Sequence, residues 1–391
     1  MSAPVILPPA RLGILGGGQL GRMFVQAART MGYTVTVLDP DPDAPAAEFA
    51  NLHLCAAFDD AEALRQLADS CAAITTEFEN VNAESMRWLA QHTVVSPRGE
   101  CVAVAQDRIR EKTFFQQHGL PVAPFLPVTQ ADDLDRDLSD YLPGILKTAR
   151  LGYDGKGQQR VRTAEEARAA WQPLGVPCVL EKMLPLQLEI SAIVTRAADG
   201  QMAVFPIAEN QHHQGILDVT LVPARVSTDL AQAAQQAACR VAEALDYVGV
   251  LAVEFFVLED GQLRVNEMAP RPHNSGHYTL DATVSSQFQQ QVRAMCGLPP
   301  AATDLLRPVA MLNLLGDVWP GAGTDACREP DWQPLQAEAQ GFLHLYGKRE
   351  ARIGRKMAHY NLLAEQATTA AAQVAILRDG LLQAAGRTRS A

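Results

Sequence analysis

The chain has 391 residues, of which 48% are hydrophobic, and a formal net charge of −11. This length predicts two or three domains with a sizeable core. The acidic balance argues against a general partner of nucleic acids or anionic membranes, because both favour basic surfaces. The sequence has no apolar run long enough to span a membrane, and its N-terminus does not resemble a signal peptide.

Seven cysteines are dispersed along the chain, and none forms a Cys-x-x-Cys pair. The sequence therefore predicts neither a zinc site nor a redox motif. An odd number of scattered cysteines favours a reducing compartment over secretion. We expect a cytoplasmic protein.

The N-terminal region is typical of a doubly wound parallel sheet. A predicted strand at 11–15 is followed by a glycine-rich turn at 16–21, a helix at 22–31 and a second strand at 34–38. This order is the first unit of such a sheet. Further strands and helices are expected to about residue 100.

The glycine-rich turn has two interpretations. Gly16, Gly18 and Gly21 match the spacing GxGxxG, and Asp39 lies near the expected position of a ribose-binding acid. A NAD-binding site is therefore one interpretation, but the motif alone is weak. The same glycines would bring backbone amides close to any phosphate at a helix N-terminus.

Two acidic residues follow the predicted strand at 73–75. Glu77 and Glu79 lie just past its carboxyl end, where sheets of this type bind ligands. An equally good interpretation is that they cap the helix expected near 83–91.

A predicted strand at 141–147 ends in Lys147, and a loop with three glycines follows at 152–158. Such a loop can close over phosphates with its backbone amides and a lysine. Its spacing does not match a P-loop. A plain hairpin remains the alternative.

A hairpin is predicted from a strand at 250–258 and the turn-forming pair Asp260 and Gly261. A two-residue turn places Glu254 directly opposite Glu267. Like charges in this arrangement repel, and partial burial makes ionisation of both costlier still. A divalent cation between them removes the conflict, and hard oxygen ligands favour magnesium completed by a phosphate. The alternative is a pair of unrelated glutamates on a solvated edge.

Other polar stretches are also notable. A polar loop is expected at 209–215, where His212 and His213 point to opposite sides of the chain and are not expected to share a metal. A second dense polar loop follows the hairpin at 270–277. The basic stretch at 344–359 is either a solvated face or a phosphate clamp.

The chain resembles the ATP-grasp superfamily, and within it the N5-carboxyaminoimidazole ribonucleotide synthases of purine biosynthesis. The motifs that carry the resemblance are GGGQLGRM at 16–23, EFEN at 77–80, GYDGKGQ at 152–158, VNEMAPRPHNSGHYT at 265–279 and HLYGKREARIGRKM at 344–357. The resemblance implies an α/β (α+β) class with an ATP-grasp fold, an N-terminal Rossmann-like pre-ATP-grasp domain and a small C-terminal β-rich domain. We predict domain boundaries at 1–102, 103–298 and 299–391.

The resemblance also implies roles for individual residues. For ATP it implies Arg108, Lys147, Gly152, Tyr153, Asp154, Gly155, Lys156, Gly157, Gln158, Glu181, Lys182, Met183, Leu184, Glu189, His212, Asn266 and Glu267. For Mg²⁺ (or Mn²⁺) it implies Glu254 and Glu267. For catalysis it implies Lys147, Arg271, His273 and Asn274. For bicarbonate and aminoimidazole ribonucleotide it implies Gln19, Leu20, Glu77, Tyr153, Asp154, Arg271, His273, Asn274, Ser275, Lys348 and Arg355.

The family's reaction transfers the γ-phosphoryl group of ATP to bicarbonate, and the resulting carboxyphosphate releases carbon dioxide to the amine of aminoimidazole ribonucleotide. The resemblance also implies a homodimer. Three alternatives stay open: another purine-pathway ATP-grasp ligase, such as formate-dependent glycinamide ribonucleotide transformylase, a NAD-dependent dehydrogenase, and a non-catalytic nucleotide sensor.

Overall fold

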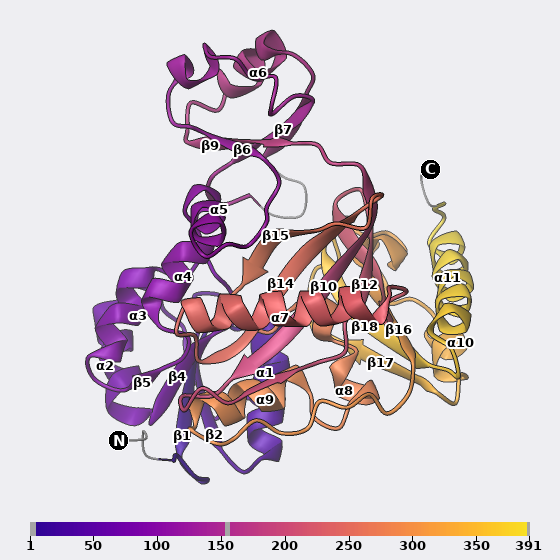
Figure 1. The fold of residues 1–391 in the computed structure, drawn as a ribbon. Helices are drawn as coiled ribbons and strands as arrows, with labels where there is room; N and C mark the ends of the chain where they lie inside the picture. Colours follow the sequence, from indigo (N-terminus) through magenta and orange to yellow (C-terminus); the bar gives the residue numbers. More distant parts are fainter. Residues whose placement is uncertain (1–4, 153–156, 389–391) are drawn as a thin grey trace.

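The computed structural model describes residues 5–152 and 157–388, and three β-sheets organise this part of the chain. Figure 1 shows the N-terminal sheet and its helices at the lower left, a small sheet at the top, and a large sheet through the centre and right. None of the helices in the described ranges combines the length and the apolar character that a membrane span requires.

The N-terminal sheet has five parallel strands in the order β3-β2-β1-β4-β5. Its strands are β1 (Arg11–Leu15), β2 (Thr34–Leu38), β3 (Leu52–Leu54), β4 (Ala73–Thr76) and β5 (Val94–Val95). Its helices are α1 (Gln19–Thr30), α2 (Ala61–Ser70) and α3 (Ala83–Ala90). The predicted doubly wound sheet is confirmed. Helix α1 begins three residues earlier than expected, because Gly18 already acts as its N-cap.

Two helices lead from this sheet into the next part of the chain, α4 (Gly99–Ala105) and α5 (Arg108–Gln117). The carboxylate of Asp107 accepts hydrogen bonds from the amides of Ile109 and Arg110 and so caps the N-terminus of α5. This cap fixes where α5 begins and therefore which of its side chains face the neighbouring sheets.

The small sheet is antiparallel, with four strands in the order β6-β9-β7-β8. Its elements are β6 (Phe125–Val128), β7 (Gly144–Thr148), β8 (Gln158–Val161), α6 (Ala164–Trp171) and β9 (Cys178–Lys182). The buried Leu146 on β7 and Leu180 on β9 pack with Ala167 of α6 in one core cluster. Lys147, next to Leu146, therefore points to the opposite face of the sheet, because successive strand residues alternate.

The large sheet has nine strands, of which eight follow the order β15-β14-β10-β12-β13-β16-β18-β17, and β11 pairs with β10. Its strands are β10 (Leu186–Arg196), β11 (Met202–Val204), β12 (Ala208–His213), β13 (Ile216–Val222), β14 (Gly249–Leu258), β15 (Leu263–Ala269), β16 (Val309–Leu315), β17 (Gly341–Leu345) and β18 (Lys356–Leu363). Helix α7 (Thr228–Ala244) covers β10 and β14 on one face, with Ala238 and Val241 in their shared core (Figure 1).

The polar loop expected at 209–215 is wrong. Strand β12 continues to His213, and the chain reverses at Gln214 and Gly215, whose φ angles are 51° and 80°. The polar composition misled the prediction because the polar residues of this strand have places in the fold, with Glu209 buried and Asn210 and His212 lining the cavity.

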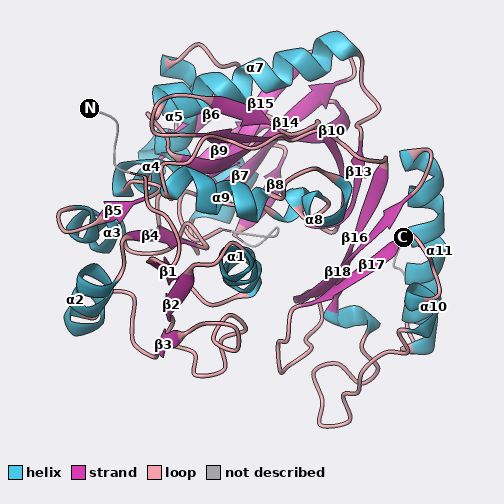
Figure 2. Ribbon diagram, turned by 90° about the horizontal axis from the view of Figure 1, so that it is seen from below, coloured by secondary structure: helices cyan, strands magenta, loops and turns pink. Residues whose placement is uncertain are grey.

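The C-terminal strands extend the large sheet, since β16 pairs with β13. Helix α11 (Ala367–Ala384) packs along these strands through Val374 and Leu381 (Figure 2). The short helices are α8 (Thr279–Ala282), α9 (Gln287–Met295) and α10 (Gln333–Gln336), with 3₁₀ turns at Ala131–Leu134, Asn274–Gly276 and Gly316–Val318. The domain boundaries at 1–102, 103–298 and 299–391 stay a prediction.

Helix α9 joins the N-terminal sheet to the large sheet. The side chain of Gln291 is 1% exposed, and its Oε1 accepts from the amide of Val250 at 2.7 Å. Its Nε2 donates to Thr75 Oγ1 at 3.0 Å and to the carbonyl of Ser96 at 3.3 Å. One buried amide thus satisfies groups on β14, on β4 and at the end of β5.

We expect Gln291→Ala to lower the free energy of unfolding by roughly 2 to 4 kcal/mol, because it leaves buried polar groups without partners and opens a cavity. Chemical denaturation measures the change. The matched control is Gln232→Ala on the exposed face of α7, which should change stability by less than about 0.5 kcal/mol. Equal effects of the two substitutions would contradict the proposed bridging role of Gln291.

Candidate active site

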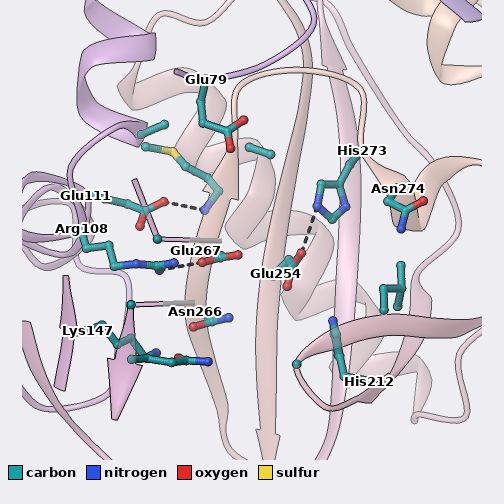
Figure 3. Close-up of a pocket in the computed structure, with 18 of the residues that line it drawn as sticks. Glu79, Arg108, Glu111, Lys147, His212, Glu254, Asn266, Glu267, His273 and Asn274 are labelled. Carbon is teal, nitrogen blue, oxygen red and sulfur yellow. Dashed lines mark hydrogen bonds and ion pairs between the residues drawn. The ribbon is translucent and has the colours of Figure 1, made fainter. Parts of the chain in front are cut away.

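A cavity of about 530 Å³ lies between the small sheet, the large sheet and α5 (Figure 3). This volume is in the range of small-molecule sites. Many residues predicted for the site line it: Arg108, Lys147, Gly152, Gly157, Gln158, Glu189, His212, Glu254, Asn266, Glu267, Arg271, His273 and Asn274. The predicted residues Tyr153, Asp154, Gly155 and Lys156 lie outside the described part of the chain.

The predicted pairing of Glu254 with Glu267 is confirmed, since the two residues face each other on β14 and β15. Figure 3 shows both side chains on the wall of the cavity, on neighbouring strands. The sheet therefore brings two carboxylates together whose mutual repulsion must be offset.

The turn of this hairpin differs from the prediction. Leu258 pairs with Gln262, so the loop has three residues and not two, and Gly261 supplies a φ angle of 80°. Nearer the site the register shifts by one residue, which leaves Asn266 as an extra residue on β15. The longer turn and the bulge cancel, and for this reason the glutamates still meet.

Each glutamate has its own cationic or polar partner. Arg108 Nη1 lies 2.7 Å from Glu267 Oε2, and His273 Nε2 lies 3.1 Å from Glu254 Oε1 (Figure 3). Burial alone would raise the pKa of Glu267. The charge and hydrogen bond of Arg108, with smaller contributions from Lys147 and His273, outweigh burial and lower that pKa to about 2.

Lys147 reaches the cavity from β7, and its Nζ lies 3.1 Å from Glu181 Oε2. Glu181 is 3% exposed and does not line the cavity. The next two residues of the predicted adenine hinge already use their backbone amides within the protein. The amide of Lys182 donates to the carbonyl of Pro124, and the amide of Met183 donates to the carbonyl of Pro143, both at 2.9 Å. Leu184 follows directly. None of these three residues is among the lining side chains.

A second group of ligand atoms lies on the neighbouring strands. Glu189, His212 and Glu254 each offer an atom within 4.8 Å of the others. His212 Nδ1 is 3.3 Å from Glu189 Oε2. Burial would lower the pKa of His212, but the hydrogen bond and charge of Glu189, together with Glu254, raise it. The imidazole is thus biased toward its cationic form.

The loop after β15 holds the remaining candidate groups. Ser275 does not line the cavity; its hydroxyl bonds to His273 Nδ1 at 2.9 Å and to Ser191 Oγ at 2.8 Å. It therefore supports the ring of His273 and faces away from the cavity. The amide group of Asn274 is buried at the wall and finds no hydrogen-bond partner among the described residues, so it is available to a ligand.

The N-terminal candidates lie elsewhere. Glu77 accepts from the amides of Gly18 at 2.5 Å and Gly21 at 2.6 Å, and Asp39 Oδ2 accepts from Gly17 at 2.7 Å. Two carboxylates thus occupy the amides that a dinucleotide phosphate would need. This arrangement weighs against the NAD-binding interpretation. Gln19 and Leu20 begin α1 and, like Glu77, do not line the cavity.

The interpretation of Glu77 and Glu79 as caps of α3 is wrong, because the side chain of Asn82 accepts from the amide of Glu84 and caps that helix. Glu79 instead reaches the cavity wall, where its Oε2 accepts from Arg271 Nε at 2.6 Å. Its position just past the carboxyl end of β4 is the feature that pointed to a ligand site.

Sequence reasoning also missed Glu111, a lining residue on the same face of α5 as Arg108. Its Oε1 accepts from the amide of Met268 at 2.7 Å. Burial, followed by the charge of Glu267, raises the pKa of Glu111 to about 8. The further lining residues Asn80, Gln106, Asn210 and Lys356 were likewise not predicted.

The two predicted phosphate-binding residues of the C-terminal part do not line the cavity. Lys348 Nζ donates to the carbonyl of Lys356 at 2.8 Å and lies 5.6 Å from the ring centroid of Tyr346. Arg355 Nη1 donates to the carbonyl of Glu350 at 2.8 Å. Lys356, the first residue of β18, is the member of this basic stretch that lines the cavity.

Three family models match successive parts of the chain. They are the ribonucleotide synthetase preATP-grasp domain at residues 10–106, the ATP-grasp domain at 113–288 and the phosphoribosylaminoimidazole carboxylase C-terminal domain at 309–373. The fold and the site therefore define an ATP-grasp enzyme with a preATP-grasp domain before it and a further domain behind it. The predicted α/β (α+β) fold class is confirmed.

Similar proteins show which family of ATP-grasp enzymes the chain belongs to. An N5-carboxyaminoimidazole ribonucleotide synthase of Bacillus subtilis is 44% identical, over 93% of this chain and 94% of its own. The crystal structure of an ADP complex of an N5-carboxyaminoimidazole ribonucleotide synthetase matches with a TM-score of 0.90 at 39% identity, covering 98% of this chain and 100% of the other. An Aspergillus clavatus synthase in complex with ADP and 5-aminoimidazole ribonucleotide matches at 0.86 and 30%, covering 96% and 99%. The chain belongs to the N5-carboxyaminoimidazole ribonucleotide synthase family.

The ion pair of Glu79 with Arg271 generates a pH prediction. Burial would raise the pKa of Glu79, but the charge and hydrogen bond of Arg271 hold it below its ordinary value of 4.5. A depressed pKa stabilises the fold above the unfolded-state value, and that contribution is lost as pH falls through the folded value. We expect Glu79→Gln to cost about 2 kcal/mol at pH 7, moderated because Glu79 is 28% exposed.

Thermal melts across pH measure this difference, which should close as pH falls below about 4.5. Glu84→Gln is the control, because Glu84 is exposed on α3 and pairs with Arg87; it should change stability by less than about 1 kcal/mol. A wild-type advantage over Glu79→Gln that grows toward low pH would contradict the assignment.

Proposed function

We propose that this protein uses ATP and bicarbonate to carboxylate 5-aminoimidazole ribonucleotide, giving N5-carboxyaminoimidazole ribonucleotide, ADP and phosphate in purine biosynthesis. The observation that carries the proposal is the near-complete match, at 44% identity, to a synthase of this name. The Aspergillus clavatus neighbour adds support, since its structure contains ADP and 5-aminoimidazole ribonucleotide.

Arg108 and Lys147 are the proposed ligands of the ATP phosphates. Both line the cavity, from α5 and β7 respectively, and guanidinium and ammonium groups are the usual cationic partners of phosphate. The backbone of Lys182 and Leu184 would hold adenine, Glu189 would hold the ribose, and His212 would approach the nucleotide. Phosphoryl transfer then depends on positioning and on neutralising charge on the moving group.

Glu254 and Glu267 fit a magnesium or manganese ion. Their carboxylates face each other, and Asn266 Oδ1, on the residue next to Glu267, is buried with no hydrogen-bond partner among the described residues. Carboxylate and amide oxygens are ligands that such ions accept. These two glutamates would hold the ion, and it would supply positive charge beside the ATP phosphates. Glu267 would then be shared with Arg108.

Arg271, His273 and Asn274 are the proposed site for bicarbonate. An oxygen of bicarbonate takes the γ-phosphoryl group and ADP leaves; the carboxyphosphate separates into carbon dioxide and phosphate. The exocyclic amine of the ribonucleotide attacks the carbon dioxide and loses a proton. The guanidinium of Arg271 and the amide of Asn274 would hold the anionic oxygens, and keeping water away from the carboxyphosphate would protect it from hydrolysis.

The ribonucleotide would lie toward the N-terminal and C-terminal parts. Lys348 and Arg355 are proposed to bind its phosphate, and Gln19, Leu20 and Glu77 are weaker candidates for contact with this substrate. We also propose a homodimer, on the family resemblance, and a cytoplasmic location, where ATP and the ribonucleotide are made. Light scattering in solution tests the dimer.

The first test is phosphate release from ATP with bicarbonate, with and without 5-aminoimidazole ribonucleotide. We expect strong stimulation by the ribonucleotide in the wild type and a loss of about 100-fold or more in Glu267→Gln, because the substitution removes the charge that holds the cation. Glu259→Gln, on the exposed loop of the same hairpin, should keep full activity. Stimulation by formate with glycinamide ribonucleotide instead would identify the other ligase.

A further inference from the structure

Lys112 on α5 is a fully buried lysine, with a relative exposure of 0%. It does not line the cavity and so does not reach the proposed substrates. Its Nζ lies 3.0 Å from Glu181 Oε2 and donates to the carbonyl of Asn266 at 3.3 Å. Burying an ammonium is costly unless it is paired, so its position needs an explanation.

The oxygen that Lys112 contacts is shared. Glu181 Oε2 also lies 3.1 Å from Lys147 Nζ, so two ammonium groups face one carboxylate oxygen. The three groups carry +1, +1 and −1, which sum to +1. Without Lys112, Lys147 and Glu181 would form a closed pair with a sum of zero. At this degree of burial such a difference is felt strongly across a few ångströms.

The geometry also connects two sheets through one helix. Arg108 and Lys112 are four residues apart and therefore lie on one face of α5. Arg108 contacts Glu267 on the large sheet, while Lys112 contacts Glu181 on the small sheet and the backbone of Asn266 beside Glu267. The distance between Lys147 and the glutamate pair is thus set partly through Lys112.

We propose that Lys112 is a positioning residue for nucleotide phosphates. It supplies the second positive charge to Glu181, so that Glu181 anchors Lys147 without neutralising it. The ammonium of Lys147 then keeps a net charge to offer the phosphates, and the small sheet stays in register with the hairpin. This inference rests on the proposed function, in which Lys147 binds ATP. A purely structural lysine would stabilise the fold and leave phosphate affinity unchanged relative to nucleoside affinity.

The test compares Lys112→Met with wild type by calorimetric titration of ADP and of adenosine. We expect ADP to bind about tenfold or more weakly to the variant, as for loss of one charge-assisted interaction, while adenosine binding changes less than about twofold. Arg110→Met removes a positive charge from the exposed face of the same helix and should leave both unchanged.

Three different results would contradict either the role of Lys112 or the proposed function. Unchanged ADP binding in Lys112→Met overturns the role of Lys112. A parallel loss of ADP and adenosine binding overturns it too, because the residue would then be structural. A wild type that binds neither ADP nor ATP overturns the proposed function itself.

The double variant Lys112→Met with Glu181→Gln provides a second, independent measurement. It removes one positive and one negative charge, so Lys147 alone restores the net value of +1. We expect ADP affinity to return to within about threefold of wild type, because no carboxylate then neutralises Lys147 and the amide oxygen at position 181 can still accept a hydrogen bond from it. If Lys112→Met does not fold, the ADP affinity of the double variant still tests the proposed role of Lys112. ADP binding as weak as in Lys112→Met, or lost in a folded double variant, would overturn the proposal.

Discussion

The repulsion between Glu254 and Glu267 is the constraint around which the site is built. Neighbouring strands hold the two carboxylates face to face, and the low dielectric of a partly buried site strengthens their conflict. Two separate segments offset this repulsion: α5 brings Arg108 to Glu267, and the loop after β15 brings His273 to Glu254. The hairpin thereby dictates where these segments must pack, and the cavity is the space they leave between them.

Ion pairs also surround the hairpin at greater distance. Two further cations near it are each paired with an acid outside the hairpin, Arg271 with Glu79 from the N-terminal part and Lys147 with Glu181 of the small sheet. Buried charges of this kind add little net stability but are costly to break singly. Their contribution is to help fix the relative placement of the three sheets.

Local pattern was enough to predict much of this arrangement. The parallel N-terminal sheet and the meeting of the two glutamates follow from residues close in sequence, whose register depends on short-range geometry. The family resemblance supplied many, but fewer than half, of the lining residues. The ion pairs Glu79–Arg271 and Lys112–Glu181 could not be predicted from the sequence, because they depend on how separate sheets pack. The turn at 259–261 was mispredicted since a glycine with positive φ serves two- and three-residue loops alike.

The three-residue turn and the bulge at Asn266 each shift the register of the two strands by one residue, in opposite directions. One adds a residue at the tip of the hairpin, and the other absorbs it before the glutamates are reached. Shortening the tip alone would slide Glu267 out of opposition and turn its side chain to the other face of the sheet. Insertions and deletions at the tip are therefore compatible with the site only when the bulge is lost or gained with them, so length variation there should be correlated across the family.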